Sequence, residues 1–112
     1  MVAVAPERGD LVWLEFSPQA GHEQAGRRPA LVVSPAPYNS RSGLALVCPV
    51  TTKSKGYPFD VNLPEGLPVW GVIQSDQLRS LDWKERKASF IARVSEDTLQ
   101  SVLDKLRPLL GL

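Results

Sequence analysis

The run Ala30-Leu31-Val32-Val33-Ser34-Pro35-Ala36-Pro37 gives the clearest structural signal in this chain. Its first four residues favour a β-strand, and the two prolines end that strand because proline has no N–H to donate to a sheet ladder. Runs of the same kind recur on both sides, so we expect about six short strands, at Leu11–Phe16, Ala30–Val33, Leu44–Val50, Phe59–Leu63, Trp70–Ile73 and Ser89–Val94. Short strands at this spacing predict a mainly β fold whose sheet curls into a small barrel.

The end of the chain has a different periodicity. Ser95 suits a helix N-cap, and Glu96 and Asp97 in the first turn suit the positive end of a helix dipole. Apolar residues then recur every three or four positions, at Leu99, Val102, Leu103, Leu106 and Leu110. We therefore expect one amphipathic C-terminal α-helix, frayed in its last turn at Pro108 because proline removes a backbone hydrogen bond.

The size and composition of the chain suit one globular unit, and we expect residues 1–112 to form a single domain. Its residues are 43% hydrophobic and 22% charged, and no apolar stretch approaches the ~20 residues that cross a bilayer. Met1–Asp10 lacks the basic start and apolar centre of a secretion signal, so the expected location is the cytoplasm. Cys48 has no second cysteine as a partner, and its apolar neighbours predict a small buried hydrophobe rather than a nucleophile.

Positive charge is concentrated in one part of the chain. The net charge is +1, yet the 36 residues from Gln24 to Phe59 contain no acidic side chain and carry five cations, Arg27, Arg28, Arg41, Lys53 and Lys55. A phosphate polyanion releases counterions when Lys and Arg neutralise it, so a local basic face can bind nucleic acid on a nearly neutral protein. The charge pattern therefore indicates RNA or DNA as a partner.

Six blocks of sequence, in this order, resemble the MazF/PemK toxins over nearly the whole chain: Gly9–Trp13, Glu23–Pro29, Ala30–Pro35, Cys48–Thr52, Lys55–Phe59 and Asp76–Asp82. The resemblance implies an SH3-like barrel with a C-terminal helix, usually a homodimer, that acts as the toxin of a toxin–antitoxin pair. It also implies a sequence-specific endoribonuclease that cuts single-stranded RNA without a metal or cofactor, leaving a 2′,3′-cyclic phosphate and a 5′-hydroxyl.

Metal-free RNA cleavage needs an activated 2′-hydroxyl, stabilisation of the charge on phosphorus and a proton for the departing 5′ oxygen. The chain has one histidine, His22, so a histidine pair within one subunit is excluded. Arg28 suits charge stabilisation, because its guanidinium stays protonated and its planar fork matches phosphate oxygens. The resemblance places the catalytic arginine at Arg28 and the catalytic threonine at Thr51, and Glu23 is our candidate for accepting the 2′-hydroxyl proton.

Other residues suit the binding of unstacked bases and of the phosphate backbone. Base edges can be read by Gln24, Asp76 and Gln77, and aromatic stacking can come from Phe16, Tyr57 and Trp83. Arg27, Lys53 and Lys55 suit phosphates. The resemblance also implies a MazE-like antitoxin, whose extended acidic tail would be attracted to the same acid-free segment.

Several residues allow a structural explanation instead. Arg28 can form a surface ion pair with Glu15 or Glu23, and Asp76 can fix a turn through local hydrogen bonds. Trp13 suits the core or a dimer interface as well as a stacking platform, and Trp70 has no close counterpart in the family's pattern.

Two other functions compete with the nuclease. A poison of DNA gyrase is one, because the barrel resembles that of CcdB, but this chain ends Leu110-Gly111-Leu112 without the tryptophan of the CcdB terminus. The other is a catalytically silent module that binds RNA or an antitoxin. The presence of both Arg28 and Thr51 favours the nuclease.

Overall fold

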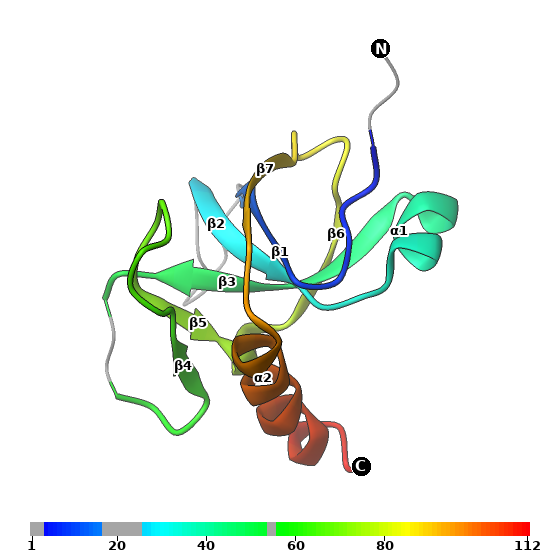
Figure 1. Ribbon diagram of the computed structural model, residues 1–112. Coiled ribbons are helices and arrows are strands. Elements are labelled where there is room, and N and C mark those ends of the chain that lie inside the picture. The colour runs from blue at the N-terminus through cyan, green and yellow to red at the C-terminus, as the bar shows by residue number, and fades with distance from the viewer. Residues whose placement is uncertain (1–3, 17–25, 54–55) are drawn as a thin grey trace.

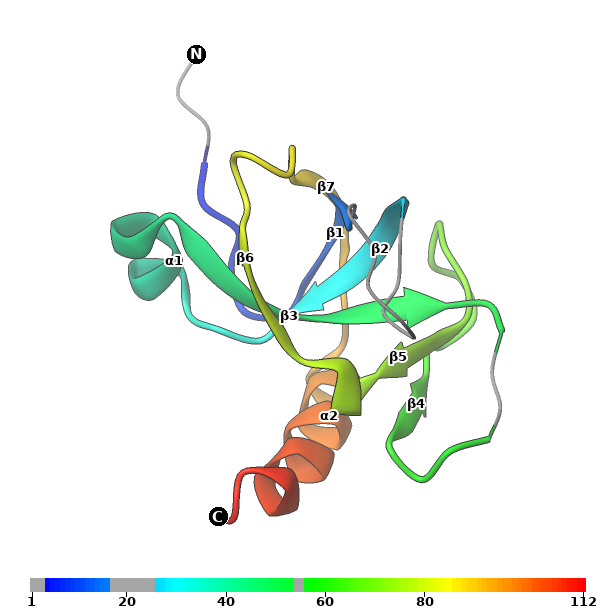
Figure 2. The same cartoon turned by 180° about the vertical axis from the view of Figure 1, so that it is seen from behind.

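The structure is a computed structural model, and it describes residues 4–16, 26–53 and 56–112. Its main feature is an antiparallel sheet in the order β4-β5-β3-β2-β1-β7, with β6 pairing with β3 (Figures 1 and 2). The strands are β1 (Asp10–Glu15), β2 (Arg27–Val32), β3 (Leu44–Thr51), β4 (Asp60–Asn62), β5 (Val72–Gln74), β6 (Arg79–Asp82) and β7 (Ser89–Arg93). The mainly β fold is confirmed.

Strand β3 joins the two parts of the sheet. It pairs along one edge with β2, where Ala30 lies opposite Pro49, and along its other edge with β6 and then β5, where Val50 lies opposite Ile73. The eight residues of β3 thus have three partner strands, so the sheet has to turn where β6 gives way to β5. Figure 2 shows β3 crossing the middle of the molecule between these neighbours.

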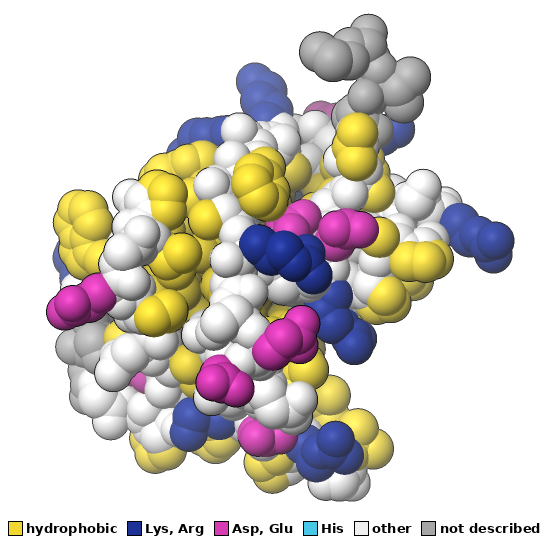
Figure 3. All heavy atoms as spheres, viewed as in Figure 1, with side chains coloured by type: hydrophobic (Ala, Val, Ile, Leu, Met, Phe, Trp, Pro, Cys, Tyr) yellow, Lys and Arg dark blue, Asp and Glu magenta, His cyan; other side chains and the backbone are white. Residues whose placement is uncertain are grey.

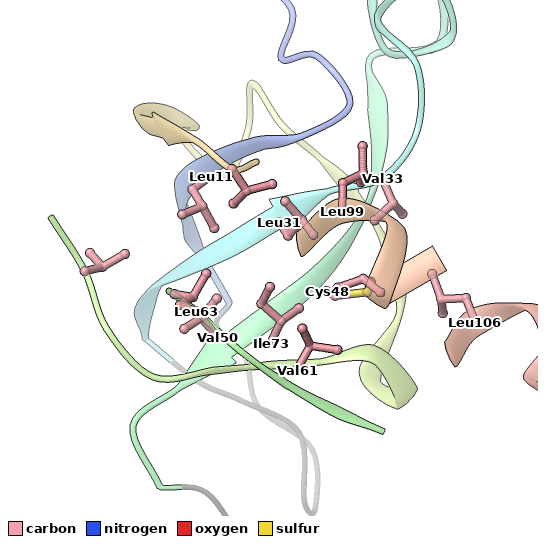
Figure 4. Packing of buried hydrophobic residues seen from close by; sticks show 13 residues of the cluster. Leu11, Leu31, Val33, Cys48, Val50, Val61, Leu63, Ile73, Leu99 and Leu106 are labelled. Carbon is pink, nitrogen blue, oxygen red and sulfur yellow. The ribbon is translucent and has the colours of Figure 1, made fainter. Parts of the chain in front are cut away.

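The two faces of the curled sheet bury two apolar clusters. Alternate residues of a strand point to opposite faces, so Leu11, Leu31 and Cys48 lie in one cluster, whereas Val12 and Ala30 lie in the other. Figure 4 shows the first cluster closed by helix α2 (Glu96–Leu109), which contributes side chains to it. The second cluster is completed by β6 and by the indole ring of residue 83.

Helix α2 forms as the sequence predicts, with one exception. The Ser95 hydroxyl accepts the Thr98 N–H at 3.2 Å and so caps a backbone donor that has no partner within the helix. The expected fraying at Pro108 is wrong, because the helix runs through it to Leu109, and the Leu110 N–H reaches the Leu106 carbonyl at 3.0 Å. A proline near a C-terminus costs one hydrogen bond, whereas the preceding turns are held by their buried apolar face.

Two elements were not expected from the sequence. Helix α1 (Ala36–Ser42) begins where the proline pair predicts a loop, because proline is tolerated in the first helical turn. Its Asn39 is fully buried, and the Asn39 side-chain amide donates to the Pro6 carbonyl at 2.8 Å. Strand β6 is the seventh strand, one more than expected. Within the described part of the chain, no helix combines the length and apolar character needed to cross a membrane.

Candidate catalytic site and nucleic-acid interface

Arg28 lies within β2, which begins at Arg27, three residues before the predicted strand Ala30–Val33. Its partner in the β1–β2 register is Leu14, whereas Glu15 lies opposite Arg27. Neighbouring residues of a strand point to opposite faces, so Arg27 and Arg28 are directed to different sides of the sheet. The β1–β2 ladder therefore fixes the Arg28 backbone, and Glu15 lies on the same face of the sheet as Arg27 and not on that of Arg28.

Thr51 is the last residue of β3 and lies close to Arg28 in the sheet. The β2–β3 ladder ends with Ala30 opposite Pro49, and Arg28 and Thr51 each lie two residues beyond that pair, so the alternation of side chains directs both to the same face. Thr51 is buried, with 5% of its surface exposed, and its Oγ1 accepts the Lys53 N–H at 3.1 Å. Since that hydroxyl oxygen acts as an acceptor here, its hydrogen can be donated to a phosphate oxygen.

Gly71, the residue before β5, lies directly against the backbone of Thr51. A Cβ atom built on Gly71 would lie 2.4 Å from the Thr51 carbonyl oxygen, and the Gly71 φ of +129° is one that side chains other than glycine rarely adopt. The same backbone geometry explains why the strand predicted at Trp70–Ile73 begins instead at Val72. A glycine at position 71 therefore lets β5 approach the candidate threonine closely.

Arg79 is a second guanidinium on this face, and no role was predicted for it from the sequence. It opens β6 opposite Val47, and its Cζ lies 5.5 Å from the centre of the Phe16 ring. Val47 lies on β3, and Phe16 directly follows β1. Strand β2 lies between β1 and β3, and β6 pairs with the other edge of β3, so the contact depends on the curl of the sheet. The only sequence signal for β6 was the alternation of Arg79 with buried Leu81. A four-residue segment with one apolar side chain is too short a pattern to predict a strand.

Two of the three predicted stacking residues are buried. Phe16 has no exposed surface and Trp83 has 4%, and the Trp83 Nε1 donates to the Asn39 carbonyl at 2.8 Å. Both rings belong to the second apolar cluster, so the prediction that they stack on bases is wrong. Tyr57 is 52% exposed and stays a candidate for stacking.

Asp76 and Gln77 lie in a short 3-10 helix, η1 (Ser75–Gln77), directly after β5. Asp76 is exposed and Gln77 is half-buried. Burial, and to a smaller extent the charge of Asp76, raises the pKa of the Cys48 thiol to about 12. Cys48 is fully buried and its thiol stays neutral at physiological pH, which confirms the expected small hydrophobe.

Three of the predicted site residues, Glu23, Gln24 and Lys55, lie outside the described residues, as does His22. Lys53 is described, and it is exposed two residues beyond Thr51. Arg27 is exposed as well, and its guanidinium donates to the Lys87 carbonyl at 3.1 Å. In the described ranges, no group of three His, Cys, Asp or Glu side chains is arranged to hold a metal ion.

A small apolar pocket opens beside this site. Its volume is about 160 Å³, and it is lined by Trp13, Arg27, Arg28, Pro29, Val50, Thr52, Val69 and Trp70. Trp13 is half-buried, and it packs against the first apolar cluster as well as lining the pocket. Trp70 is 75% exposed. Figure 3 shows hydrophobic side chains gathered on the side of the molecule where β2 and the loop between β4 and β5 lie.

Comparison with known proteins places this geometry in a family. Residues 7–110 match the family described as PemK-like, MazF-like toxins of type II toxin–antitoxin systems. The endoribonuclease toxin MazF of Escherichia coli K12 is 45% identical over 106 residues, which cover 95% of each chain. A crystal structure of MazF from Deinococcus radiodurans superposes with a TM-score of 0.93 at 56% identity, covering 96% of this chain and 98% of that one. A MazE–MazF complex from the same organism gives a TM-score of 0.86 at 50% identity, covering 96% and 97%. The chain therefore belongs to the PemK-like, MazF-like toxins of type II toxin–antitoxin systems.

Proposed function

We propose that this protein is a sequence-specific endoribonuclease toxin that cuts single-stranded RNA without a metal ion. The observation that carries the proposal is the placement of Arg28 and Thr51 on adjacent strands, facing the same side of the sheet. Relatives with 45% and 38% identity over nearly the whole chain are named as endoribonucleases, which supports the same activity here. Cleavage of messenger RNA would stop translation and growth, and its site of action would be the cytoplasm.

In the proposed reaction the ribose 2′ oxygen attacks the adjacent phosphorus and the bond to the 5′ oxygen breaks. The 2′-hydroxyl proton passes to a base, for which we propose the Glu23 carboxylate, and the departing 5′ oxygen takes up a proton. The products are a 2′,3′-cyclic phosphate and a 5′-hydroxyl, so no water is consumed. Charge grows on the non-bridging oxygens as phosphorus becomes five-coordinate, and groups aimed at those oxygens lower the barrier.

Arg28 and Thr51 suit that stabilising role in different ways. The Arg28 guanidinium carries a permanent charge and offers paired N–H donors to phosphate oxygens, but it is too basic to accept a proton at neutral pH. The Thr51 hydroxyl supplies one further donor, and its burial means that little water competes for it. Arg79 adds positive charge on the same face and thereby attracts the RNA backbone.

We further propose that an antitoxin occupies the same surface as RNA. Solved MazE–MazF complexes from Deinococcus radiodurans, 48–54% identical to this chain in their matched chains, show that such partners exist for close relatives. An acidic, partly hydrophobic tail would be attracted by the exposed cations Arg27 and Lys53 and would exclude RNA. Dimerisation is proposed by analogy with the family.

Incubating the purified protein with an unstructured RNA in EDTA tests the activity. Fragments that end in 2′,3′-cyclic phosphate and 5′-hydroxyl groups would support the proposal. Intact RNA with a shifted band on a native gel would point to a silent binding module, and intact RNA without binding would overturn the assignment. Sequencing the 5′ ends of the fragments would identify the motif that is cut.

A further inference from the structure

The pocket between the two tryptophans has a composition that suits one kind of ligand. Trp13 and Trp70 present indole rings, Pro29 adds a flat apolar ring, and the guanidinium-bearing residues Arg27 and Arg28 belong to the same lining. Aromatic faces bind unstacked bases, and neighbouring cations bind the attached phosphates.

The exposed position of the Trp70 ring favours a role in binding a ligand. It is a large aromatic residue that is 75% exposed, at the end of the loop between β4 and β5. The next residue, Gly71, packs against the Thr51 backbone, so the loop that carries Trp70 is anchored to the candidate catalytic strand. An anchored, exposed indole can stack on a ligand with little loss of conformational freedom.

The pocket adjoins the candidate catalytic site at the start of β2 and the end of β3. Arg28 and Thr52 line the pocket, and Thr52 directly follows Thr51. Trp13 and Val50 lie on the first-cluster face of the sheet, whereas Arg28 and Thr51 are directed to the second-cluster face. An RNA strand that passes from one face to the other at this end of the sheet would bring a nucleotide near the scissile phosphate to the pocket. Arg27 is held by its bond to the Lys87 carbonyl, and a guanidinium has further N–H groups to offer a phosphate.

From these observations we infer that the Trp13–Trp70 pocket is a nucleobase subsite, which takes the unstacked base of a nucleotide near the scissile phosphate. The inference rests on the proposed nuclease function and adds a determinant of which RNA is cut. Because stacking tolerates every base, the subsite contributes mainly to affinity, and the shape of the pocket then favours some bases over others.

The test uses the wild-type protein and three variants with an RNA oligonucleotide that contains the mapped cut site. Trp70→Ala removes the exposed ring, Trp70→Phe keeps an aromatic face, and Tyr38→Ala is the matched control, because Tyr38 is also an exposed aromatic residue but lies on α1 at the other end of β3. We expect Trp70→Ala to raise KM about tenfold with kcat nearly unchanged, since stacking is worth about 1–3 kcal/mol per base. Trp70→Phe should retain most of the affinity, and Tyr38→Ala should match the wild type.

A second readout separates binding from cleavage. A copy of the same oligonucleotide that is methylated on the 2′ oxygen cannot be cut, and its binding should quench the tryptophan fluorescence of the wild type. Trp83 is buried in the second cluster and serves as an internal reference, so Trp70→Phe should lose the part of the quenching that comes from Trp70 and keep the part that comes from Trp13.

Three outcomes would overturn the inference. One is an unchanged KM for a folded Trp70→Ala protein. Another is a change in molecular mass by light scattering in that variant, because the ring would then belong to a contact between copies. The third is weaker antitoxin binding with unaltered RNA cleavage, which would make the pocket a site for protein. Failure of the nuclease proposal is distinct, since the wild type itself would then leave RNA intact.

Discussion

Arg28 and Thr51 are proposed to act on one phosphate because the strand ladder directs them to one face, although they are far apart in sequence. The same alternation directs Arg27 to the other face, so two adjacent arginines have different roles. Arg28 is proposed to contact the reacting phosphate, and Arg27 the backbone of bound RNA or an antitoxin. Substitutions at single residues can separate these roles.

Replacing Thr51 by valine tests the hydroxyl with almost no change in shape. We expect Thr51→Val to lower kcat about 100-fold, because one donor to the transition state is lost, while KM changes little. Thr51→Ser keeps the hydroxyl and should retain most of the activity. The control is Ser101→Ala, which removes an exposed hydroxyl from α2, measured by the same fragment assay. Equal rates for Thr51→Val and the wild type would remove Thr51 from the mechanism.

The buried thiol predicts a specific dependence of stability on pH. The pKa of Cys48 is about 12 in the folded protein and 9.0 as the reference for an unfolded chain, so between these values the unfolded state loses a proton that the folded state keeps. Unfolding then releases one proton, and the free energy of unfolding falls as pH rises, by about 1.4 kcal/mol per pH unit from this group. Below about pH 9 both states are neutral and the contribution is constant.

Urea denaturation between pH 8 and 11 measures this effect when the wild type is compared with Cys48→Ala. The alanine variant should be less stable at pH 8, because a buried side chain is shortened, but its stability should fall less steeply with pH. Parallel curves for the two proteins would contradict a buried, neutral thiol.

At the scale of elements, the junction of β3 and β5 is the part on which the site depends most. Gly71 has a positive φ and lies directly against the Thr51 carbonyl, whereas Gly66 has a φ of +94° with open space around it. Ala at position 66 should therefore cost backbone strain alone, about 1–2 kcal/mol of unfolding free energy. Ala at position 71 adds a clash and should cost about 1–3 kcal/mol more.

The same pair of variants tests the positioning of Thr51. We expect Gly71→Ala to lose most of its RNA cleavage even below its melting temperature, because the clash displaces the Thr51 backbone, and Gly66→Ala to stay close to the wild type. Thermal melts followed by circular dichroism give the stability, and cleavage rates in the folded range give the activity. Equal activity of the two folded variants would show that Thr51 does not depend on this contact.

The sequence predicts those elements whose signals are local. Runs of aliphatic residues bounded by proline or glycine give six of the strands, and a capping serine with a leucine stripe gives α2. Strand β6 was missed because Arg79–Asp82 has one apolar residue and pairs with β3 through a tertiary contact. Helix α1 was missed because prolines that start a helix also end a strand.

The candidate site could be predicted in part. The resemblance named Arg28 and Thr51 as residues, but their common face follows from a register between strands that no local pattern fixes. The curl of the sheet accounts for what was missed or wrong: it brings Arg79 over the Phe16 ring and buries that ring, which had been expected to stack on bases.

At the scale of the whole molecule, cationic side chains flank the two ends of β3. Lys53 follows one end of that strand and Arg41 precedes the other, and the eight-residue strand between them spans about 26 Å. A screening length of about 8 Å at physiological salt makes each cation act locally. Both the RNA and the antitoxin should therefore respond to charges near Thr51 and not to net charge.

Charge reversal tests this arrangement. Charge reversal at Arg27, Lys53 or Lys55 should weaken both the antitoxin complex and RNA binding. We expect each of the three variants, with glutamate at one of these positions, to lose about tenfold in either affinity at low salt and less at high salt. Arg41→Glu changes the net charge equally and should have little effect. Titration calorimetry or fluorescence anisotropy measures both affinities, and equal losses for Arg41→Glu would mean that net charge, not a local surface, attracts the partners.

The most direct test of the account is the single-turnover cleavage rate of Arg28→Gln, compared with Arg27→Gln, on the mapped RNA substrate in EDTA. The account predicts that Arg28→Gln cuts about 100–1,000 times more slowly than the wild type, because a donor aimed at the transition-state charge is gone, while Arg27→Gln mainly loses affinity. Circular dichroism should show both variants folded. A folded Arg28→Gln protein that cuts RNA at the wild-type rate would contradict the central claim.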